Sequence, residues 1–196
     1  MKIGMDVDGV ILDYEKVLRT YGDLYDFIEL KKDGIINRNE HYLRNRYNWT
    51  DEERMNFINQ YFMKLSKQAE LMPGAKDVIH LLQKDGHELI VISARGVTVE
   101  GMQDVAREKF ERENITFSKY YWKQEDKLEI AEKEKIDYMI DDNFDICKKL
   151  SENGIKTIYF RDKDMKKLEN ENVIEVSNWG EIYRIIKNRK YVQNSL

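Results

Sequence analysis

The sequence predicts an α/β protein, a doubly wound (Rossmann-like) parallel sheet with a helical region inserted after the first strand. Three observations support this prediction. From residue 73 onward, short apolar runs alternate with amphipathic stretches, which is typical of a parallel sheet covered by helices. Residues 13–72 show the periodicity of helices instead. Acidic and hydroxyl side chains end three of the predicted strands, where α/β sheets bind their ligands.

The first predicted strand ends in two acids. Ile3 and Met5 indicate a short buried strand, and Asp6 and Asp8 follow on either side of one valine. Gly9 then lets the backbone turn. Carboxylates are almost never fully buried unless they are paired or bind a metal. The pair therefore fits either a Mg²⁺-assisted phosphoryl-transfer site with an aspartate nucleophile or an ordinary strand exit with solvated acids.

The helical region follows this strand directly. Apolar side chains at steps of three and four over residues 14–29 predict an amphipathic helix, whereas residues 31–46 are polar and irregular. Thr50 and Glu53 have the spacing of a capping box, so a second helix begins there. Pro73, followed by a glycine, ends the region. The predicted boundaries are residues 1–12 and 73–196 for the α/β core and residues 13–72 for the helical region.

The remaining predicted elements alternate in type. A helix ended by Gly86 precedes a strand with an almost continuous apolar run, as expected of a buried parallel strand. Asn178 is placed to cap the last helix. In order, we predict helices at 75–85, 102–110, 128–134, 143–153 and from 179, and strands at 88–92, 115–122, 137–140, 155–160 and 173–176.

Composition excludes several classes of protein. The net charge is −4, so the chain lacks the basic excess that binding to a nucleic acid polymer requires. A single cysteine, Cys147, excludes an internal disulfide framework and a cysteine metal cluster. The sequence shows neither a signal peptide nor a transmembrane segment, and we expect a cytoplasmic protein. The oligomeric state stays open.

Four separated motifs occur in the order found in the haloacid dehalogenase superfamily of phosphohydrolases, which the chain resembles. They are Asp-Val-Asp-Gly-Val at 6–10, Ser93 after Glu-Leu-Ile-Val-Ile, Lys127 ahead of a helix, and Asp141-Asp142 after Tyr-Met-Ile. The helical region is similar to the type 1 cap of that superfamily. Its size, together with the sequences Ser-Ala-Arg and Ile-Asp-Asp-Asn, is most like the cytosolic 5′(3′)-deoxyribonucleotidase-like branch.

The resemblance implies a Mg²⁺-dependent phosphomonoester hydrolase that acts through an aspartyl-phosphate intermediate. Asp6 would be the nucleophile, and Asp8 would protonate the leaving oxygen and then activate water. Mg²⁺ would be bound by Asp6, the backbone carbonyl of Asp8, and Asp141. Lys127 would offset the charge around Asp6. The residues implied to bind the substrate phosphate are Ser93, Ala94, Arg95 and Lys127.

Several of these residues have a structural alternative. Lys123 could serve in place of Lys127, which we prefer because it opens the helix leading to the next strand. Ser93 could satisfy backbone groups after its strand. Arg95 could form a surface salt bridge, and Asp142 could be the N-cap of the following helix.

The substrate is predicted from the helical region. Its aromatic residues could stack on a nucleobase beside Arg44, Arg46 and Asn48, although such residues usually form a helical core. The aromatic candidates are Tyr42, Tyr47, Trp49 and Phe57. We therefore favour a 5′-nucleotidase acting on small (deoxy)nucleoside monophosphates. The alternatives are a phosphatase for sugar phosphates or other small metabolites, a phosphomutase, and, outside the enzymes, a receiver-like phospho-acceptor signalling domain.

Overall fold

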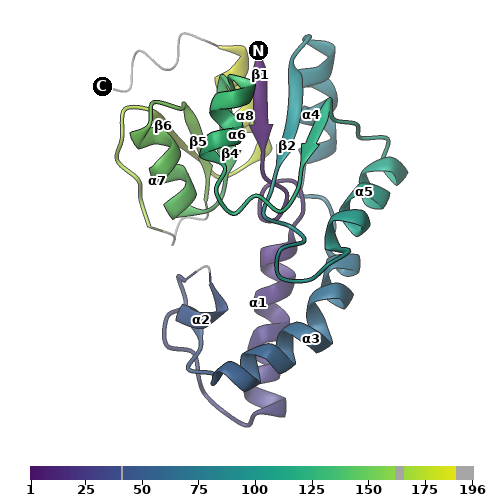
Figure 1. The fold of residues 1–196 in the computed structure, drawn as a ribbon, viewed down its shortest axis with the longest axis vertical. Helices are drawn as coiled ribbons and strands as arrows, with labels where there is room; N and C mark the ends of the chain where they lie inside the picture. The colour runs from purple at the N-terminus through teal and green to yellow at the C-terminus, as the bar shows by residue number, and fades with distance from the viewer. Residues whose placement is uncertain (41, 162–165, 189–196) are drawn as a thin grey trace.

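The computed structural model describes residues 1–40, 42–161 and 166–188; the other positions of the predicted core, 162–165 and 189–196, lie outside the described residues. The described residues form a parallel six-stranded sheet in the order β3-β2-β1-β4-β5-β6 (Figure 1). This confirms the predicted fold class. The strands are β1 (Lys2–Met5), β2 (Glu88–Ile92), β3 (Lys119–Tyr121), β4 (Tyr138–Asp141), β5 (Thr157–Phe160) and β6 (Val173–Val176).

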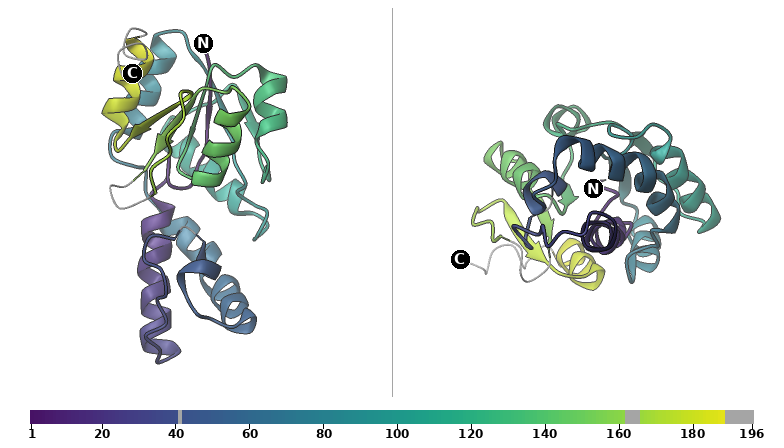
Figure 2. Two further views of the ribbon diagram at one scale, coloured as in Figure 1. Left: turned by 90° about the vertical axis from the view of Figure 1, so that its left-hand side faces the viewer. Right: turned by 90° about the horizontal axis from the view of Figure 1, so that it is seen from below.

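Helices cover both faces of the sheet (Figure 2). Side chains alternate across a strand, so Leu89 and Val91 join one apolar cluster while Ile90 and Ile92 join another. The first cluster includes residues of α4 (Ala75–Lys84), α5 (Met102–Arg112) and α8 (Trp179–Lys187). The second includes residues of α6 (Leu128–Glu134) and α7 (Phe144–Glu152). The two-sided burial explains why β2 is apolar along almost its whole length.

The segment 13–72, called the insert below, forms a separate body beyond the carboxyl ends of the strands (Figure 1). It contains α1 (Tyr14–Leu24), a π-helical turn η1 (Tyr25–Glu29), α2 (Leu43–Arg46) and α3 (Asp51–Gln68). The capping box at the start of α3 is present, because Thr50 accepts a hydrogen bond from the Glu53 amide and the Glu53 carboxylate accepts one from the Thr50 amide.

Two crossing segments join the insert to the core. Leu12 and Leu71 form an antiparallel bridge. Next to it, the Asp13 amide donates to the Glu70 carbonyl at 2.8 Å. Lys109 of α5 is buried and donates to the carbonyl of Ala69, which ends α3. The insert is therefore connected to the core directly beside the acids that follow β1.

Two expectations about the ends of elements have different outcomes. Asn178 caps α8 as predicted, since its side chain accepts from the Glu181 amide at 3.0 Å. The strand predicted at 115–122 is shorter, because β3 pairs only at Lys119–Tyr121. Phe117 instead packs edge-on against Phe110 of α5, with ring centroids 5.3 Å apart. Among the described residues, no helix is both long and apolar enough to span a bilayer.

Candidate active site

The ends of two neighbouring strands place the first acids. Met5 pairs with Ile140 in the parallel register, and the Asp6 amide donates to the Ile140 carbonyl at 2.9 Å. Asp6 therefore follows β1 beside Asp141, the last residue of β4. Parallel strands end at the same edge of a sheet, and this register brings the two carboxylates together from positions far apart in the chain.

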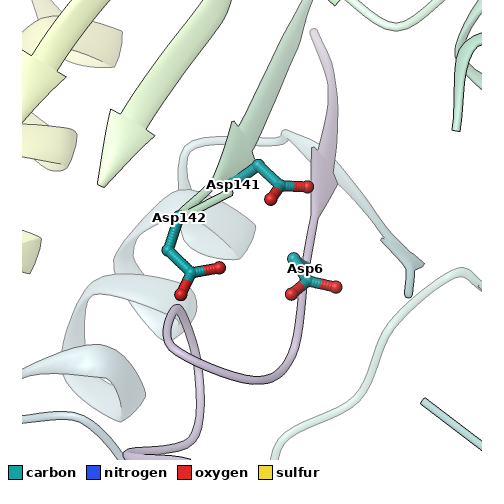
Figure 3. A group of neighbouring side chains, drawn as sticks. All are labelled: Asp6, Asp141 and Asp142. Atoms are coloured by element: carbon teal, nitrogen blue, oxygen red, sulfur yellow. The ribbon is translucent and has the colours of Figure 1, made fainter. Parts of the chain in front are cut away.

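Three buried carboxylates form a compact cluster at this edge. Asp6, Asp141 and Asp142 each offer one oxygen, and these oxygens lie within 4.8 Å of one another (Figure 3). The turn after β1 passes close to the third acid, because a Cβ atom at Gly9 would lie only 1.9 Å from Asp142 Oδ2. Gly9 also has φ +76°, so glycine is required there for both conformation and space.

Lys127 is the cation of this cluster. Its Nζ lies 2.8 Å from Asp6 Oδ1 and 2.6 Å from Asp141 Oδ2, and its side chain is 4% exposed. Burial alone would lower the pKa of Lys127, but the charges of Asp141 and Asp6 raise it, so the amine stays protonated. Lys123 instead pairs with Glu100 at 2.6 Å, and its side chain is 45% exposed. The structure thus brings Lys127, and not Lys123, to the acids.

The cluster fits a divalent cation. Burial raises the pKa of Asp142, and the charges of Asp141 and Asp6 raise it further. One ammonium group cannot balance three carboxylates, whereas Mg²⁺ prefers oxygen ligands of this kind. Asp142 is not the N-cap of α7, the structural alternative considered from the sequence, because Asn143 caps this helix by accepting from the amides of Asp145 and Ile146. The sequence analysis did not include Asp142 among the metal ligands, although the doublet of acids after an apolar strand was a signal that could have found it.

Asp8 faces a different partner. Its carboxylate accepts a hydrogen bond from the Arg95 guanidinium and is not part of the three-acid cluster. Removal from water raises the pKa of Asp8 to about 6, while the charge of Arg95 opposes the shift. A carboxyl group that titrates near neutral pH can both donate and accept a proton, which suits a general acid and base.

The loop after β2 supplies further polar groups. Ser93 is buried at the end of β2, where its amide donates to the Tyr121 carbonyl at 3.0 Å and its hydroxyl accepts from the Arg95 amide at 3.3 Å. Arg95 is fully buried, so it does not form the surface salt bridge considered from the sequence. Ser93, Ala94 and Arg95 line the same cavity as the acids.

This cavity has a volume of about 660 Å³ and lies between the core and the insert. The core contributes the acids, Lys127 and the loop after β2. Each helix of the insert contributes as well. The insert residues that line it include Leu18, Tyr42, Arg44, Arg54, Ile58 and Phe62. The size is sufficient for a small-molecule substrate.

Comparison with known proteins identifies the relatives of the chain. No family model matches it. The Bacillus subtilis protein YqfW, named as a candidate nucleotidase, is 26% identical over 193 residues, which are 97% of this chain and 96% of YqfW. A nucleotidase from Clostridium acetobutylicum is 24% identical over 95% of this chain and 93% of its own length.

Solved structures share the fold. A haloacid dehalogenase-like hydrolase from Streptococcus pneumoniae superposes with a TM-score of 0.65 at 15% identity, covering 94% of this chain and 97% of that one. The chain therefore shares the fold of haloacid dehalogenase-like hydrolases. YfnB from Bacillus subtilis, described as a candidate haloacid dehalogenase hydrolase, was solved bound to magnesium and gives a TM-score of 0.61 at 16% identity, over 95% of this chain and 98% of its own.

Most of the aromatic residues considered for a base-stacking wall form the core of the insert. Tyr47, Trp49 and Phe57 are buried and do not line the cavity, and Tyr47 stacks on Trp49 with ring centroids 4.2 Å apart. That part of the prediction is wrong, because the irregular segment folds back over α1 and needs an apolar centre. Tyr42 is the exception, since it is 46% exposed and lines the cavity.

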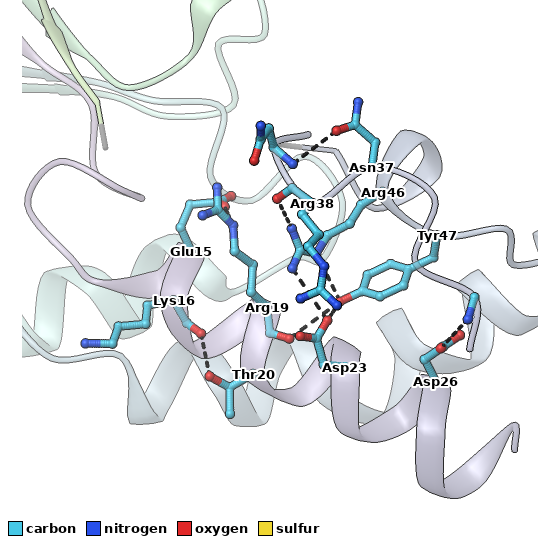
Figure 4. Close-up of polar contacts among 12 residues, drawn as sticks. Glu15, Lys16, Arg19, Thr20, Asp23, Asp26, Asn37, Arg38, Arg46 and Tyr47 are labelled. Atoms are coloured by element: carbon cyan, nitrogen blue, oxygen red, sulfur yellow. Dashed lines mark hydrogen bonds and ion pairs between the residues drawn. The ribbon is translucent and has the colours of Figure 1, made fainter. Parts of the chain in front are cut away.

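The arginines of the insert divide in the same way. Arg46 is buried, donates to the Arg38 carbonyl and the Tyr47 hydroxyl, and lies 3.5 Å from Asp23 of α1 (Figure 4). It therefore holds the irregular segment against α1. Arg44, two residues earlier, is exposed and lines the cavity. The insert thus presents Arg44 and Tyr42 to the cavity.

Proposed function

We propose that the chain is a Mg²⁺-dependent phosphomonoesterase that hydrolyses nucleoside monophosphates, with deoxynucleotides included, through an aspartyl phosphate formed on Asp6. The observation that carries this proposal is the position of Asp6. It lies at the end of β1, between Lys127 and two further acids, and faces a cavity of substrate size. Two relatives with nucleotidase names that align over nearly their whole length support the substrate class.

The proposed reaction uses two carboxylates in two steps. An oxygen of Asp6 bonds to phosphorus as the ester P–O bond breaks, and Asp8 gives its proton to the departing oxygen. Asp8 then takes a proton from a water molecule whose oxygen attacks phosphorus, and the bond between Asp6 and the phosphate breaks. Asp6 is thereby regenerated, and inorganic phosphate leaves.

The surrounding residues stabilise charge during these steps. Asp6, Asp141, Asp142 and the backbone carbonyl of Asp8 would hold Mg²⁺, whose charge reduces the repulsion between a carboxylate and a phosphate dianion. Lys127 keeps the oxygens of Asp6 oriented and balances part of their charge. The phosphate would be bound by Ser93, Ala94, Lys127 and the main chain of Arg95, because the side-chain nitrogens of Arg95 already donate to protein groups.

The leaving group would occupy the insert side of the cavity. Tyr42 offers an aromatic face and Arg44 offers hydrogen-bond donors, which suit a planar base with carbonyl or ring-nitrogen acceptors. The apolar side chains of Leu18, Ile58 and Phe62 complete that wall. Contacts so far from phosphorus raise turnover only for leaving groups that fit them.

The chemistry is tested by Asp6→Asn, which keeps the shape of the side chain and removes the nucleophilic charge. Hydrolysis of an aryl phosphate in Mg²⁺ should fall by about three or more powers of ten, while circular dichroism shows an intact fold. Asp145→Asn, at an exposed position of α7, is the matched control and should keep its activity. Metal-dependent turnover of Asp6→Asn near the wild-type rate would refute the mechanism.

The substrate class is tested by a panel compared through kcat/KM in Mg²⁺. It contains nucleoside monophosphates, sugar phosphates and phosphorylated small acids. We expect nucleoside monophosphates to lead, and Arg44→Ala to reduce kcat/KM for them about tenfold while an aryl phosphate is unaffected. Sugar phosphates ahead by about tenfold would replace the nucleotidase with a sugar phosphatase. Transfer of the phosphoryl group to a second hydroxyl would indicate a phosphomutase, and a stable phosphoprotein without turnover would indicate a receiver-like domain.

A further inference from the structure

The side chain of Arg95 connects the core and both long helices of the insert. It comes from the loop after β2, and its Nε donates to the Met102 carbonyl at 2.9 Å. One terminal nitrogen donates to the Asp8 carboxylate, and the other donates to the Ser66 hydroxyl on α3. The guanidinium carbon lies 5.3 Å from the centre of the Tyr14 ring on α1. Four segments therefore fix one guanidinium group.

Two of these contacts belong to the insert. Ser66 is fully buried, and Tyr14 is 5% exposed. Both lie on the insert side of the two crossing segments that are joined by the bridge between Leu12 and Leu71. Any movement of the insert about these crossing segments would separate Ser66 and Tyr14 from Arg95. The position of the guanidinium group thus depends on the position of the insert.

Of the two remaining contacts, the one with Asp8 belongs to the proposed chemistry. The Arg95 side chain has no exposed surface, and the Asp8 carboxylate is the anion that it contacts. A guanidinium group presents its donors in a rigid planar fork, so fixing two of its sides fixes the third. The positions of the Met102 carbonyl and the Ser66 hydroxyl therefore determine where Arg95 holds the Asp8 oxygen.

We propose that Arg95 is a positioning residue that orients Asp8 for proton transfer when the insert is packed on the core, and that Ser66 and Tyr14 set the position of Arg95. This inference rests on the proposed function. The step affected is the first one, in which an Asp6 oxygen bonds to phosphorus, the ester P–O bond breaks, and the Asp8 proton moves to the departing oxygen. Insert docking and acid catalysis are then coupled through one side chain.

A role in positioning differs measurably from a role in phosphate binding. A departing alkoxide needs a proton, so esters such as nucleoside monophosphates depend on the general acid. A departing 4-nitrophenolate is stable without one. Loss of Asp8 positioning should therefore reduce hydrolysis of the alkyl ester much more than hydrolysis of 4-nitrophenyl phosphate. Loss of phosphate binding would reduce both equally, since both carry the same phosphate.

The experiment compares kcat/KM for the two esters, because this constant reports the steps up to the aspartyl phosphate and excludes its hydrolysis. Arg95→Lys should reduce the value for the alkyl ester about a hundredfold and that for the aryl ester only about threefold. Ser66→Ala removes one support of Arg95 and leaves its charge in place. It should reduce the alkyl value about tenfold and the aryl value by less than about twofold.

The matched control is Ser151→Ala. Ser151 is also buried and donates to a carbonyl of its own helix, Lys148, but it lies in α7 on the core. Its ratio of alkyl to aryl kcat/KM should equal that of the wild type. Thermal unfolding of each variant checks the fold, and Ser66→Ala remains informative if Arg95→Lys does not fold.

Two results would overturn the inference. Equal losses on both esters in Arg95→Lys would assign Arg95 to phosphate binding. An unchanged ratio in a folded Ser66→Ala protein would show that the insert does not influence Asp8 through Arg95. Failure of the proposed phosphomonoesterase chemistry looks different, because the wild type would then hydrolyse neither ester, whereas failure of the nucleotide substrate class alone would leave hydrolysis of the aryl ester.

Discussion

Charged side chains in the core and in the insert lie in contrasting surroundings. At the strand ends of the core, Asp6 and Asp141 share one lysine and border the cavity. In the insert, Asp26 is equally buried, but it accepts hydrogen bonds from the Gly34 amide and the Trp49 indole, each at 2.7 Å. The core gathers several acids around one lysine, whereas the insert satisfies its acid by local donors. An excess of buried carboxylates over cations, and not burial itself, distinguishes the candidate active site.

A second contrast, within the insert, separates the residues that pack on one another from the residues that line the cavity. The aromatic residues of the insert mostly pack on one another, as Phe57 does with Tyr25 and Trp49. The cavity wall is left to a few residues at the edge of that packing, such as Tyr42 and Arg44. Substitutions in the insert should therefore separate cleanly into effects on stability and effects on selectivity.

The largest expected effect is a loss of stability on substitution at the centre of the insert. Phe57→Ala deletes a fully buried ring, and we expect it to reduce the free energy of unfolding by about 3–5 kcal/mol in urea denaturation. Tyr42→Ala removes a half-exposed ring, with an expected loss of less than about 1 kcal/mol. An equal loss in the two variants would break the distinction between packing and cavity residues.

The next effect lies in the core. Lys127→Met should reduce turnover of an aryl phosphate by about a hundredfold or more, because the charge around Asp6 loses its buried cation. Lys123→Met is the matched control, since it removes only an exposed ion pair with Glu100 and should retain near wild-type turnover. Damage by Lys123→Met and tolerance of Lys127→Met would contradict the geometry of the cluster.

A smaller effect concerns the third acid of the cluster. Asp142→Asn should weaken Mg²⁺ binding, measured by calorimetry, by at least about tenfold, because one charged oxygen ligand is lost. In metal-free buffer the variant should be at least as stable as the wild type, because one of three mutually repelling carboxylates is gone. Asp145→Asn should change neither quantity. Unchanged Mg²⁺ affinity in Asp142→Asn would remove this residue from the metal site.

The smallest expected effect is a pH-dependent change in stability, at the end of the sheet opposite the acid cluster. Hydrogen bonds from Lys119 and Tyr121 lower the pKa of Glu134 from about 4.5 to about 2. A carboxylate with a lowered pKa stabilises the fold above its unfolded-state pKa, and this contribution disappears as the pH falls through the folded-state value. Wild type should therefore unfold at a higher temperature than Glu134→Gln at pH 7, with a difference that shrinks between about pH 4.5 and about pH 2.

Glu132→Gln is the control for this measurement, because Glu132 is exposed two positions earlier in the same helix. Its difference from the wild type should not change with pH. A constant difference for Glu134→Gln as well would show that its ion pairs do not stabilise the fold.

Much of the core could be predicted from the sequence, because its signals are local. A short apolar run followed by acids indicates a buried strand with a polar end, and the register of β1 and β4 then has to bring those ends together. This reasoning found Asp6, Ser93 and Asp141, and the capping box at Thr50 was found from spacing alone. Each of these residues takes its role from its own strand or helix.

The sequence by itself determined the alternation of elements, the acids at the strand ends and the place of the insert, because backbone periodicity and strand direction fix all three. Only the tertiary structure decided which lysine reaches Asp6, that Asp142 joins the acids and that Arg95 contacts Asp8 and Ser66. The physical reason is that a long side chain after a strand can point several ways. Its direction is set by the charges and packing that other segments bring to it.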